Sequence, residues 1–301
     1  MTGIRIIRAG PLCTVQDNGR FGMLRHGVSA SGPMDRAAFE RAAAWLGAAG
    51  SAGLEFTQTG IAFAVEDGEV AAAFEGADFT ISHNGKPAAW RGRLLLAAGD
   101  VVEITPGTWG NYGYVRFDRE LDVPCVMGSQ ATNTVAALGG RAGRSLAPGD
   151  RIGFGAVVPP RAGLQPRAAV PDHAPIRVLW GLHADVFPAQ VRERFASEAF
   201  TISPHLNRMG ARLEDRAGVF EGQPPLTLVS DAVVPGDVQV LGDGTPIVLL
   251  RDHQPTGGYA RIATVISADL DRFVQLRPGT EVRFRPVTLQ HAHAILKGRE
   301  R

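Results

Sequence analysis

The chain has 301 residues, which is enough for about two domains of ~100–200 residues each and for a sizeable core. Its formal net charge is +1, so it has no excess of positive charge with which to hold nucleic acid or an anionic membrane non-specifically. Apart from arginines and histidines, its only basic residues are Lys86 and Lys297. Neither lysine lies in a phosphate-binding loop or in a Met-Lys-Met setting that carries biotin, so any ATP or biotin would be brought by another polypeptide.

The sequence contains no recognisable targeting segment and no metal-ligand motif. The amino terminus carries charges where a signal peptide needs an apolar stretch, and no run of 18 apolar residues occurs. We therefore expect a cytoplasmic protein without a membrane or nucleic-acid partner. Cys13 and Cys125 are expected to be small, buried and reduced. The histidines and cysteines show no ligand spacing, so no metal site is predicted.

A helix is predicted near the amino terminus. Gly32 at the cap, Pro33 at the first helical position and Asp35 within the first turn fit the preferences of a helix start. Gly47 or Gly50 is expected to end this helix.

Two polar stretches rich in glycine, residues 14–22 and 27–35, lead into the start of this helix. Free N–H groups at a helix start favour an anion such as a carboxylate or phosphate, and Arg20 could hold such a group bidentately. The alternative is a well-capped helix that follows a polar hairpin.

Most of the remaining sequence predicts strands. Three segments share the form Leu-x-(Ala/Pro)-Gly-(Asp/Thr)-x-apolar-x-apolar, namely residues 96–104, 146–154 and 276–284. Each is expected to form a turn with positive φ at its glycine, followed by a half-buried strand. Because two copies precede a proline-rich stretch around residues 158–175 and one follows it, we predict two β lobes, residues 1–170 and 171–301.

A second helix is predicted over residues 184–196. Val186, Phe187, Val191 and Phe195 recur at helical spacing and are expected to lie in the core, with arginines on the opposite face.

Two arginines lie on either side of a short apolar stretch that follows this second predicted helix in the sequence. Arg208 and Arg212, together with Asn207, form a pattern that often binds acidic substrates. A structural salt bridge to Glu214 or Asp215 is an equally common use of such arginines.

The densest group of polar side chains lies at residues 252–259, between two apolar runs that predict buried strands, 246–250 and 262–266. The adjacent Gly257 and Gly258 either let the backbone approach a ligand closely or form a hairpin connection with positive φ. The sequence favours neither interpretation, because glycine and aspartate are also ordinary turn residues.

Eight motifs occur in the order found in one known family: Thr14-Val-Gln-Asp-x-Gly-Arg20, Gly27-Val-x-x-Ser-Gly-Pro-Met-Asp35, Leu54-Glu55, Gly128-Ser129, Gly139-Gly140 with Gly143-Arg144-x-Leu-x-x-Gly-Asp150, Asn207-Arg-Met-Gly-x-Arg-Leu213, Val234-Pro-Gly-x-Val-Gln239, and Asp243-Gly-x-Pro-Ile-Val-Leu-Leu250 through Thr256-Gly-Gly-Tyr259. The chain thus resembles the allophanate hydrolase subunit 2 family over roughly residues 4–290. That family includes the C subunits of 5-oxoprolinases, KipA-type regulators and part of the carboxyltransferase domain of urea carboxylase.

The resemblance implies a mostly β fold of two cyclophilin-like β-barrel lobes with a few short helices. It also implies two partners, a subunit 1/B (KipI-like) protein and a LamB/YcsF-like protein that serves as the A subunit. The implied activity is a hydrolase reaction, the ATP-dependent opening of the lactam of 5-oxoproline to glutamate. ATP and Mg²⁺ would act through the complex, and this chain would be active only with its partners.

The same resemblance suggests which side chains take part. Candidates for acid–base work or for holding Mg²⁺ are Asp17, Asp35, Glu55 and Asp252. Candidates for binding and orienting the substrate are Gln16, Arg20, Ser31, Asn207, Arg208, Gln239, Gln254, Thr256 and Tyr259, with Arg212 as a further donor.

Several positions depart from the usual family pattern. Amides that the family carries around the first helix are absent from Ala43-Ala-Trp-Leu-Gly-Ala48, Pro255 replaces a threonine, and Arg261 replaces a lysine. Two alternatives to the 5-oxoprolinase role therefore stay open. One is a biotin-dependent, urea carboxylase-like carboxyltransferase component, and the other is a KipA-type regulator that binds a kinase-inhibitor protein.

Overall fold

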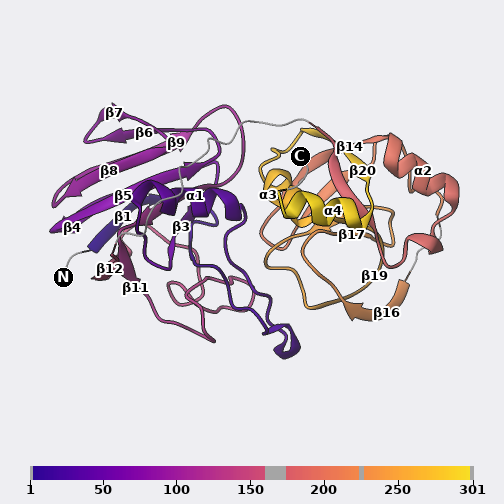
Figure 1. Cartoon of the computed structure of the whole chain (residues 1–301), viewed down its shortest axis with the longest axis horizontal. Helices are drawn as coiled ribbons and strands as arrows, with labels where there is room; N and C mark the ends of the chain where they lie inside the picture. Colours follow the sequence, from indigo (N-terminus) through magenta and orange to yellow (C-terminus); the bar gives the residue numbers. More distant parts are fainter. Residues whose placement is uncertain (1–2, 160–173, 224–226, 299–301) are drawn as a thin grey trace. The chain divides into compact units, whose positions relative to one another are not determined.

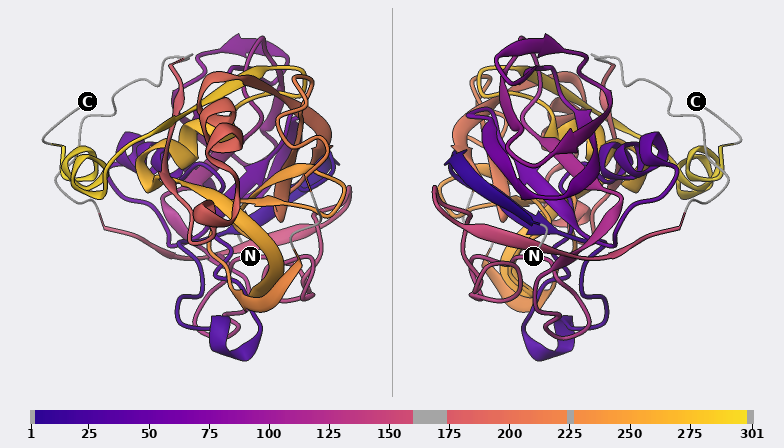
Figure 2. Two further views of the ribbon diagram at one scale, coloured as in Figure 1. Left: turned by 90° about the vertical axis from the view of Figure 1, so that its right-hand side faces the viewer. Right: turned by 90° about the vertical axis from the view of Figure 1, so that its left-hand side faces the viewer.

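The computed structural model describes residues 3–159, 174–223 and 227–298. It divides the chain into two compact units. Unit 1 comprises Met1–Met23 and Ala30–Pro171, and unit 2 comprises Leu24–Ser29 and Asp172–Arg301. Strands far outnumber helices in both units, so the prediction of a mostly β, cyclophilin-like fold with a few short helices is confirmed (Figure 1, Figure 2). The predicted boundary near residue 170 lies outside the described residues.

The described part of unit 1 contains two sheets and one α-helix. Its elements are β1 (Gly3–Ala9), β2 (Thr14–Gln16), α1 (Arg36–Leu46), β3 (Gly53–Phe56), β4 (Ile61–Asp67), β5 (Glu69–Gly76), β6 (Phe79–His83), β7 (Lys86–Ala88), β8 (Gly92–Ala97), β9 (Val101–Pro106), β10 (Gly113–Phe117), β11 (Arg119–Asp122) and β12 (Arg151–Val157). One sheet has the order β11-β12-β1-β4-β9-β6-β7, and the other β2-β3-β10-β5-β8.

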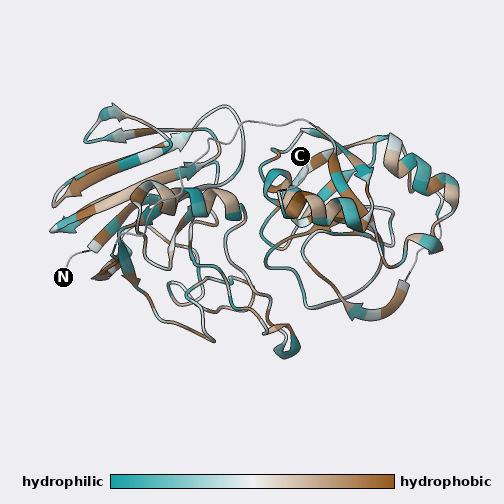
Figure 3. Cartoon of the chain, in the orientation of Figure 1, coloured by the Kyte–Doolittle hydropathy of each residue, from teal (hydrophilic) through white to brown (hydrophobic). Residues whose placement is uncertain are grey.

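The core of unit 1 lies between these two sheets. Phe63 of β4 and Phe117 of β10 belong to different sheets, yet their ring centroids are 6.0 Å apart in an edge-to-face arrangement. Ile4 and Ile6 of β1 are also fully buried there. Hydrophobic residues, brown in Figure 3, recur along the strands among hydrophilic ones in teal, as expected where one face of a sheet is buried.

Unit 2 is built around a closed barrel. Its elements are η1 (Leu24–His26), β13 (Ile176–Trp180), η2 (Ala184–Val186), α2 (Ala189–Ser197), β14 (Ala199–Leu206), β15 (Gly210–Glu214), β16 (Thr227–Ala232), β17 (Asp237–Val240), β18 (Pro246–Leu249), β19 (Thr256–Val265), α3 (Ser267–Val274), β20 (Glu281–Pro286) and α4 (Leu289–Leu296). The sheet order is β13-β20-β14-β15-β18-β17-β19-β16, and β13 also pairs with β19. This additional pairing closes seven strands into a ring and leaves β16 outside it as an edge strand.

The three repeated segments form the same structure in both units. Gly99, Gly149 and Gly279 all have positive φ, and each directly precedes the residue before a strand. In each copy the N–H of the glycine donates a hydrogen bond to the carbonyl of one residue in a neighbouring strand. The N–H of that same residue donates to the carbonyl of the residue directly after the glycine. For the first copy the neighbouring residue is Val65. The prediction of a repeated turn that starts a strand is confirmed.

The predicted start of α1 was wrong, although its end was right. The N-cap is Asp35 rather than Gly32, because the Asp35 carboxylate accepts a hydrogen bond from the N–H of Ala38 at 2.8 Å. Pro33 therefore lies before the helix. Gly47 ends the helix with φ of 67°, a left-handed conformation that glycine adopts without strain.

The second predicted helix is broken into two pieces. Pro188 separates the short η2 turn from α2, because proline has no N–H to continue the first piece and suits a helix start. Phe187, Val191 and Phe195 are buried as predicted. Val186 is 46% exposed, which contradicts its predicted place in the core.

The two cysteines differ in their surroundings. Both are free thiols, as predicted. Cys13 is buried in the core of unit 1, and burial raises the pKa of its thiol to about 11. Cys125 is exposed, so the prediction that it is buried was wrong. Position in a loop after β11, rather than residue type, decides its accessibility.

Candidate functional site

The candidate site in unit 2 is a pocket of about 630 Å³, which we call the unit 2 pocket. Four of the predicted substrate-binding residues line it, namely Asn207, Gln239, Gln254 and Tyr259. Arg212 of β15 is a further lining residue. The rest of the lining is largely apolar and comes from neighbouring strands of the barrel, which is the usual composition of a small-molecule site.

Gln239 and Gln254 form a pair of side-chain amides in this pocket. The Nε2 of Gln254 donates to the Oε1 of Gln239 at 3.3 Å. Gln239 is 2% exposed, and its own Nε2 is buried without a hydrogen-bond partner among the described residues. A buried donor without an acceptor costs about 1–3 kcal/mol, so this nitrogen is suited to meet a ligand atom.

A glycine makes room for this amide. A Cβ on Gly257 would lie 2.4 Å from the Nε2 of Gln239, which is closer than any real contact. Gly257 and Gly258 lie inside β19 and neither has positive φ, so the interpretation as a hairpin connection was wrong. The backbone of Gly257 instead lies close to the side chain of Gln239, and the predicted approach to a ligand stays a prediction.

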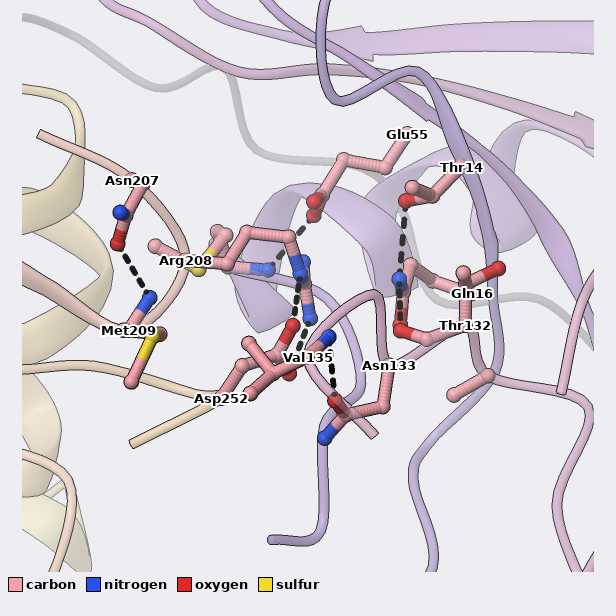
Figure 4. Close-up of polar contacts among 12 residues, drawn as sticks. Thr14, Gln16, Glu55, Thr132, Asn133, Val135, Asn207, Arg208, Met209 and Asp252 are labelled. Atoms are coloured by element: carbon pink, nitrogen blue, oxygen red, sulfur yellow. Dashed lines mark hydrogen bonds and ion pairs between the residues drawn. The ribbon is translucent and has the colours of Figure 1, made fainter. Parts of the chain in front are cut away.

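Arg208 and Asp252 form a buried ion pair. The Nε of Arg208 is 2.8 Å from Oδ2 of Asp252, and its Nη2 is 3.1 Å from Oδ1 (Figure 4). The two side chains are 2% and 0% exposed. Arg208 is thus paired in a fork geometry with Asp252, rather than with Glu214 or Asp215.

The remaining predicted residues of unit 2 are less involved in the pocket. The Oδ1 of Asn207 accepts a hydrogen bond from the N–H of Met209 (Figure 4). The same oxygen accepts from the N–H of Gly210, so Asn207 holds the turn before β15. Thr256 is exposed at the first position of β19 and does not line the pocket. His253 is buried, and burial lowers the pKa of its imidazole.

In unit 1, Gln16 organises the loop before α1. Its Oε1 accepts a hydrogen bond from the N–H of Gly32. Its Nε2 donates to the hydroxyl of Thr14 and to the carbonyl of Thr132 (Figure 4). Gln16 is fully buried by these contacts. The neighbouring Ser31 has φ of 57°, and its buried hydroxyl has no partner among the described residues.

Glu55 and Asp35 meet around a tyrosine. The Oε2 of Glu55 accepts hydrogen bonds from the N–H of Met34 at 2.7 Å and from the hydroxyl of Tyr114 at 2.8 Å. The same hydroxyl accepts from the N–H of Asp35. Burial and the nearby Glu55 raise the pKa of Tyr114 well above its ordinary value, so the phenol stays protonated. We did not predict Tyr114, although a tyrosine inside a short apolar strand is a signal for such a buried partner.

Asp17 and Arg20 are also engaged within unit 1. The Asp17 carboxylate accepts hydrogen bonds from the N–H of Gly19, from the hydroxyl of Ser129 and from the N–H of Gln130. The guanidinium of Arg20 donates to the carbonyl of Ala131 and is 1% exposed. Both side chains therefore fasten the loop at residues 128–131 to the segment before α1.

The predicted acidic residues form no metal-binding cluster within the described part of either unit. Asp17, Asp35 and Glu55 belong to unit 1, while Asp252 belongs to unit 2 and is paired with Arg208. Within the described ranges, no group of three His, Cys, Asp or Glu side chains could hold a metal ion. The carboxylates are instead used as hydrogen-bond acceptors for backbone and side-chain donors.

Residues 26–286 match the family described as carboxyltransferase domain, subdomain A and B. The chain belongs to this family. It is 33% identical to the C subunit of 5-oxoprolinase from Escherichia coli, over 99% of this chain and 94% of that protein. It is 30% identical to the C subunit of 5-oxoprolinase from Haemophilus influenzae, over 99% of this chain and 95% of that protein.

Solved structures of larger proteins contain the same fold. The urea carboxylase of Kluyveromyces lactis superposes with a TM-score of 0.88 at 26% identity, over 99% of this chain. This chain spans 28% of that protein. The predicted resemblance to the allophanate hydrolase subunit 2 family, with its 5-oxoprolinase C subunits, is therefore confirmed. Among the described residues, no helix is long and apolar enough to span a membrane.

Proposed function

We propose that this chain is the C subunit of a 5-oxoprolinase, which opens the lactam of 5-oxoproline to glutamate with hydrolysis of ATP. The single observation that carries this proposal is its similarity to two 5-oxoprolinase C subunits over nearly their whole lengths. A domain shared with larger enzymes would support only the family, whereas a match from end to end also supports the same role in a complex.

The chemistry of the reaction is consistent with a complex in which one protein binds ATP and another binds the substrate. A lactam is an unactivated amide, so its opening is eased when its oxygen is phosphorylated and the developing charge is stabilised. The described residues provide no carboxylate cluster for Mg²⁺, and the sequence has no phosphate-binding lysine loop. We therefore assign ATP and Mg²⁺ to the partners, a subunit 1/B protein and a LamB/YcsF-type protein. The role of this chain is to bind and orient the substrate.

Reconstitution tests this function directly. The chain is co-purified with its KipI-like and LamB/YcsF-like partners and supplied with ATP, Mg²⁺ and 5-oxoproline. Glutamate, ADP and phosphate in equal amounts are expected only when all three proteins are present. Glutamate formation without this chain, or its absence from the complete mixture, contradicts the proposal.

A second candidate is a biotin-dependent carboxyltransferase component, which the structural similarity to urea carboxylase favours. In that case carboxybiotin would come from another protein and an amide such as urea would accept the carboxyl group. Dependence on bicarbonate and on a biotinylated partner distinguishes this role. Tight binding of a kinase-inhibitor protein without turnover would instead indicate a KipA-type regulator.

A further inference from the structure

The amide pair of the unit 2 pocket has one nitrogen and one oxygen that make no hydrogen bond within the described residues. Because Gln254 donates its Nε2 to the Oε1 of Gln239, the two atoms left over are the Nε2 of Gln239 and the Oε1 of Gln254. Neither makes a hydrogen bond to any other part of the chain that the structure describes. Both side chains line the pocket.

A ligand that uses both atoms needs an acceptor next to a donor. A cyclic amide has this arrangement, because its ring holds the C=O and the N–H on the same edge. An open-chain peptide bond is trans and points these two groups in opposite directions. The amide pair therefore selects a lactam or a cyclic urea over an ordinary peptide group.

Arg212 adds a charge requirement to the same pocket. Its guanidinium makes no hydrogen bond or ion pair within the described parts of the chain. Asp243 lies within electrostatic range, but its carboxylate accepts a hydrogen bond from the N–H of Thr245 at 2.9 Å. The residues that line the unit 2 pocket include no Asp or Glu, whereas a neighbouring hollow that Arg212 also borders is lined by several acidic residues. An anionic group on the ligand would therefore find an arginine and no repelling carboxylate inside the unit 2 pocket.

We infer that the unit 2 pocket binds cyclic amides that carry a carboxylate, with the amide edge on Gln239 and Gln254 and the carboxylate on Arg212. The apolar lining, which includes Leu241 and Ile247, suits the methylene groups of such a ring. This inference rests on the proposed function and sharpens it, because it places the substrate in one unit and assigns each of its polar groups. Urea lacks the carboxylate and would lose the contact with Arg212.

Binding measurements with three probes test the assignment. The wild-type complex, without ATP, is titrated with L-5-oxoproline, with 2-pyrrolidinone, which lacks the carboxylate, and with N-methyl-5-oxoproline, which lacks the N–H. Ligand-observed nuclear magnetic resonance gives the Kd values. We expect L-5-oxoproline to bind about tenfold or more tightly than either of the other two, since each loses one hydrogen-bonded group.

Variants with matched controls then show which residue binds which group of each probe. Arg212→Gln should weaken L-5-oxoproline about tenfold or more and leave 2-pyrrolidinone unchanged, whereas Gln239→Met should weaken both. The controls are Arg216→Gln, an exposed arginine outside the pocket, and Gln290→Met, an exposed glutamine on α4. Circular dichroism and thermal unfolding confirm that each variant is folded before its Kd is used.

The outcomes separate this inference from the proposed function. The inference is overturned if Arg212→Gln weakens the binding of all probes equally. It is also overturned if the Kd values of Gln239→Met stay within twofold of wild type. Both conclusions hold even if the complex still forms glutamate. Absence of L-5-oxoproline binding to the wild-type complex overturns it as well. The expected pattern of Kd values without any ATP-dependent glutamate formation supports the inference and contradicts the proposed function.

Discussion

Substituting Asp252 by Asn should destabilise unit 2 strongly, because it removes the buried negative charge that the Arg208 guanidinium binds in a fork geometry. The two side chains are 0% and 2% exposed, and two hydrogen bonds of 2.8 and 3.1 Å join them. Removal of one partner from such a buried pair costs about 3–5 kcal/mol, whereas a surface pair contributes about 0–1 kcal/mol. The exposed pair Arg216–Glu214 provides the matched control, through Glu214→Gln.

A double-mutant cycle separates the pair from its surroundings. Arg208→Met removes the guanidinium charge and keeps most of the apolar side chain, so the double variant with Asp252→Asn lacks both charges of this ion pair. The double variant should therefore be destabilised by less than the sum of the two single variants, with a coupling free energy of about 2 kcal/mol or more.

Hydrogen exchange of the peptide that spans β18 and β19 is a suitable assay, because it reports on unit 2 alone. A loss of about 3 kcal/mol accelerates exchange by more than a hundredfold, since every 1.4 kcal/mol is a factor of ten. If Asp252→Asn changes the rate by less than tenfold, or no more than Glu214→Gln does, the reasoning about a buried and tightly paired charge is refuted.

Three further predictions concern other sites. A thiol reagent at pH 8 should modify Cys125 in the native protein and Cys13 only after unfolding, because burial raises the pKa of Cys13 to about 11; two modified thiols in the native state would contradict this. Burial lowers the pKa of His253 below its ordinary 6.5, so the stability that the neutral imidazole contributes is complete above about pH 6.5 and is lost as the pH falls. His253→Gln should therefore flatten the decrease in Tm between pH 7 and pH 5. An unchanged slope of Tm against pH would contradict this prediction. Gly257→Ala should displace the Gln239 amide and raise the KM of the reconstituted complex several-fold while costing only about 1 kcal/mol of unfolding free energy, and an unchanged KM would show that Gln239 does not contact substrate.

The fold class was predictable because it depends on local patterns. The repeated turn segments combine a glycine that needs positive φ with an alternating strand, and all three formed the expected structure. Errors arose where two local signals competed. Asp35 and Gly32 both fit a helix cap, and the side-chain hydrogen bond to Ala38 favours Asp35. Pro188 interrupts a helical pattern whose apolar spacing continues across it.

The candidate site was only partly predictable, because its contacts join residues far apart in the sequence. Gln16 and Gln239 are both buried glutamines in strands, and nothing in the local sequence separates them. In the structure Gln16 uses its amide to bond Gly32, Thr14 and Thr132, whereas the Nε2 of Gln239 has no hydrogen-bond partner in the part of the chain that the structure describes.

This difference also explains which predicted residues are suited to meet a ligand. A polar side chain that its own chain already satisfies gains little from a ligand, since binding would first have to break an existing hydrogen bond. Asp17 and Asp252 are satisfied in this way by partners distant in sequence, such as Gln130 and Arg208. Arg212 makes no such bond within the described residues, so it is the charged group of the unit 2 pocket that a ligand can engage without breaking a bond that already exists.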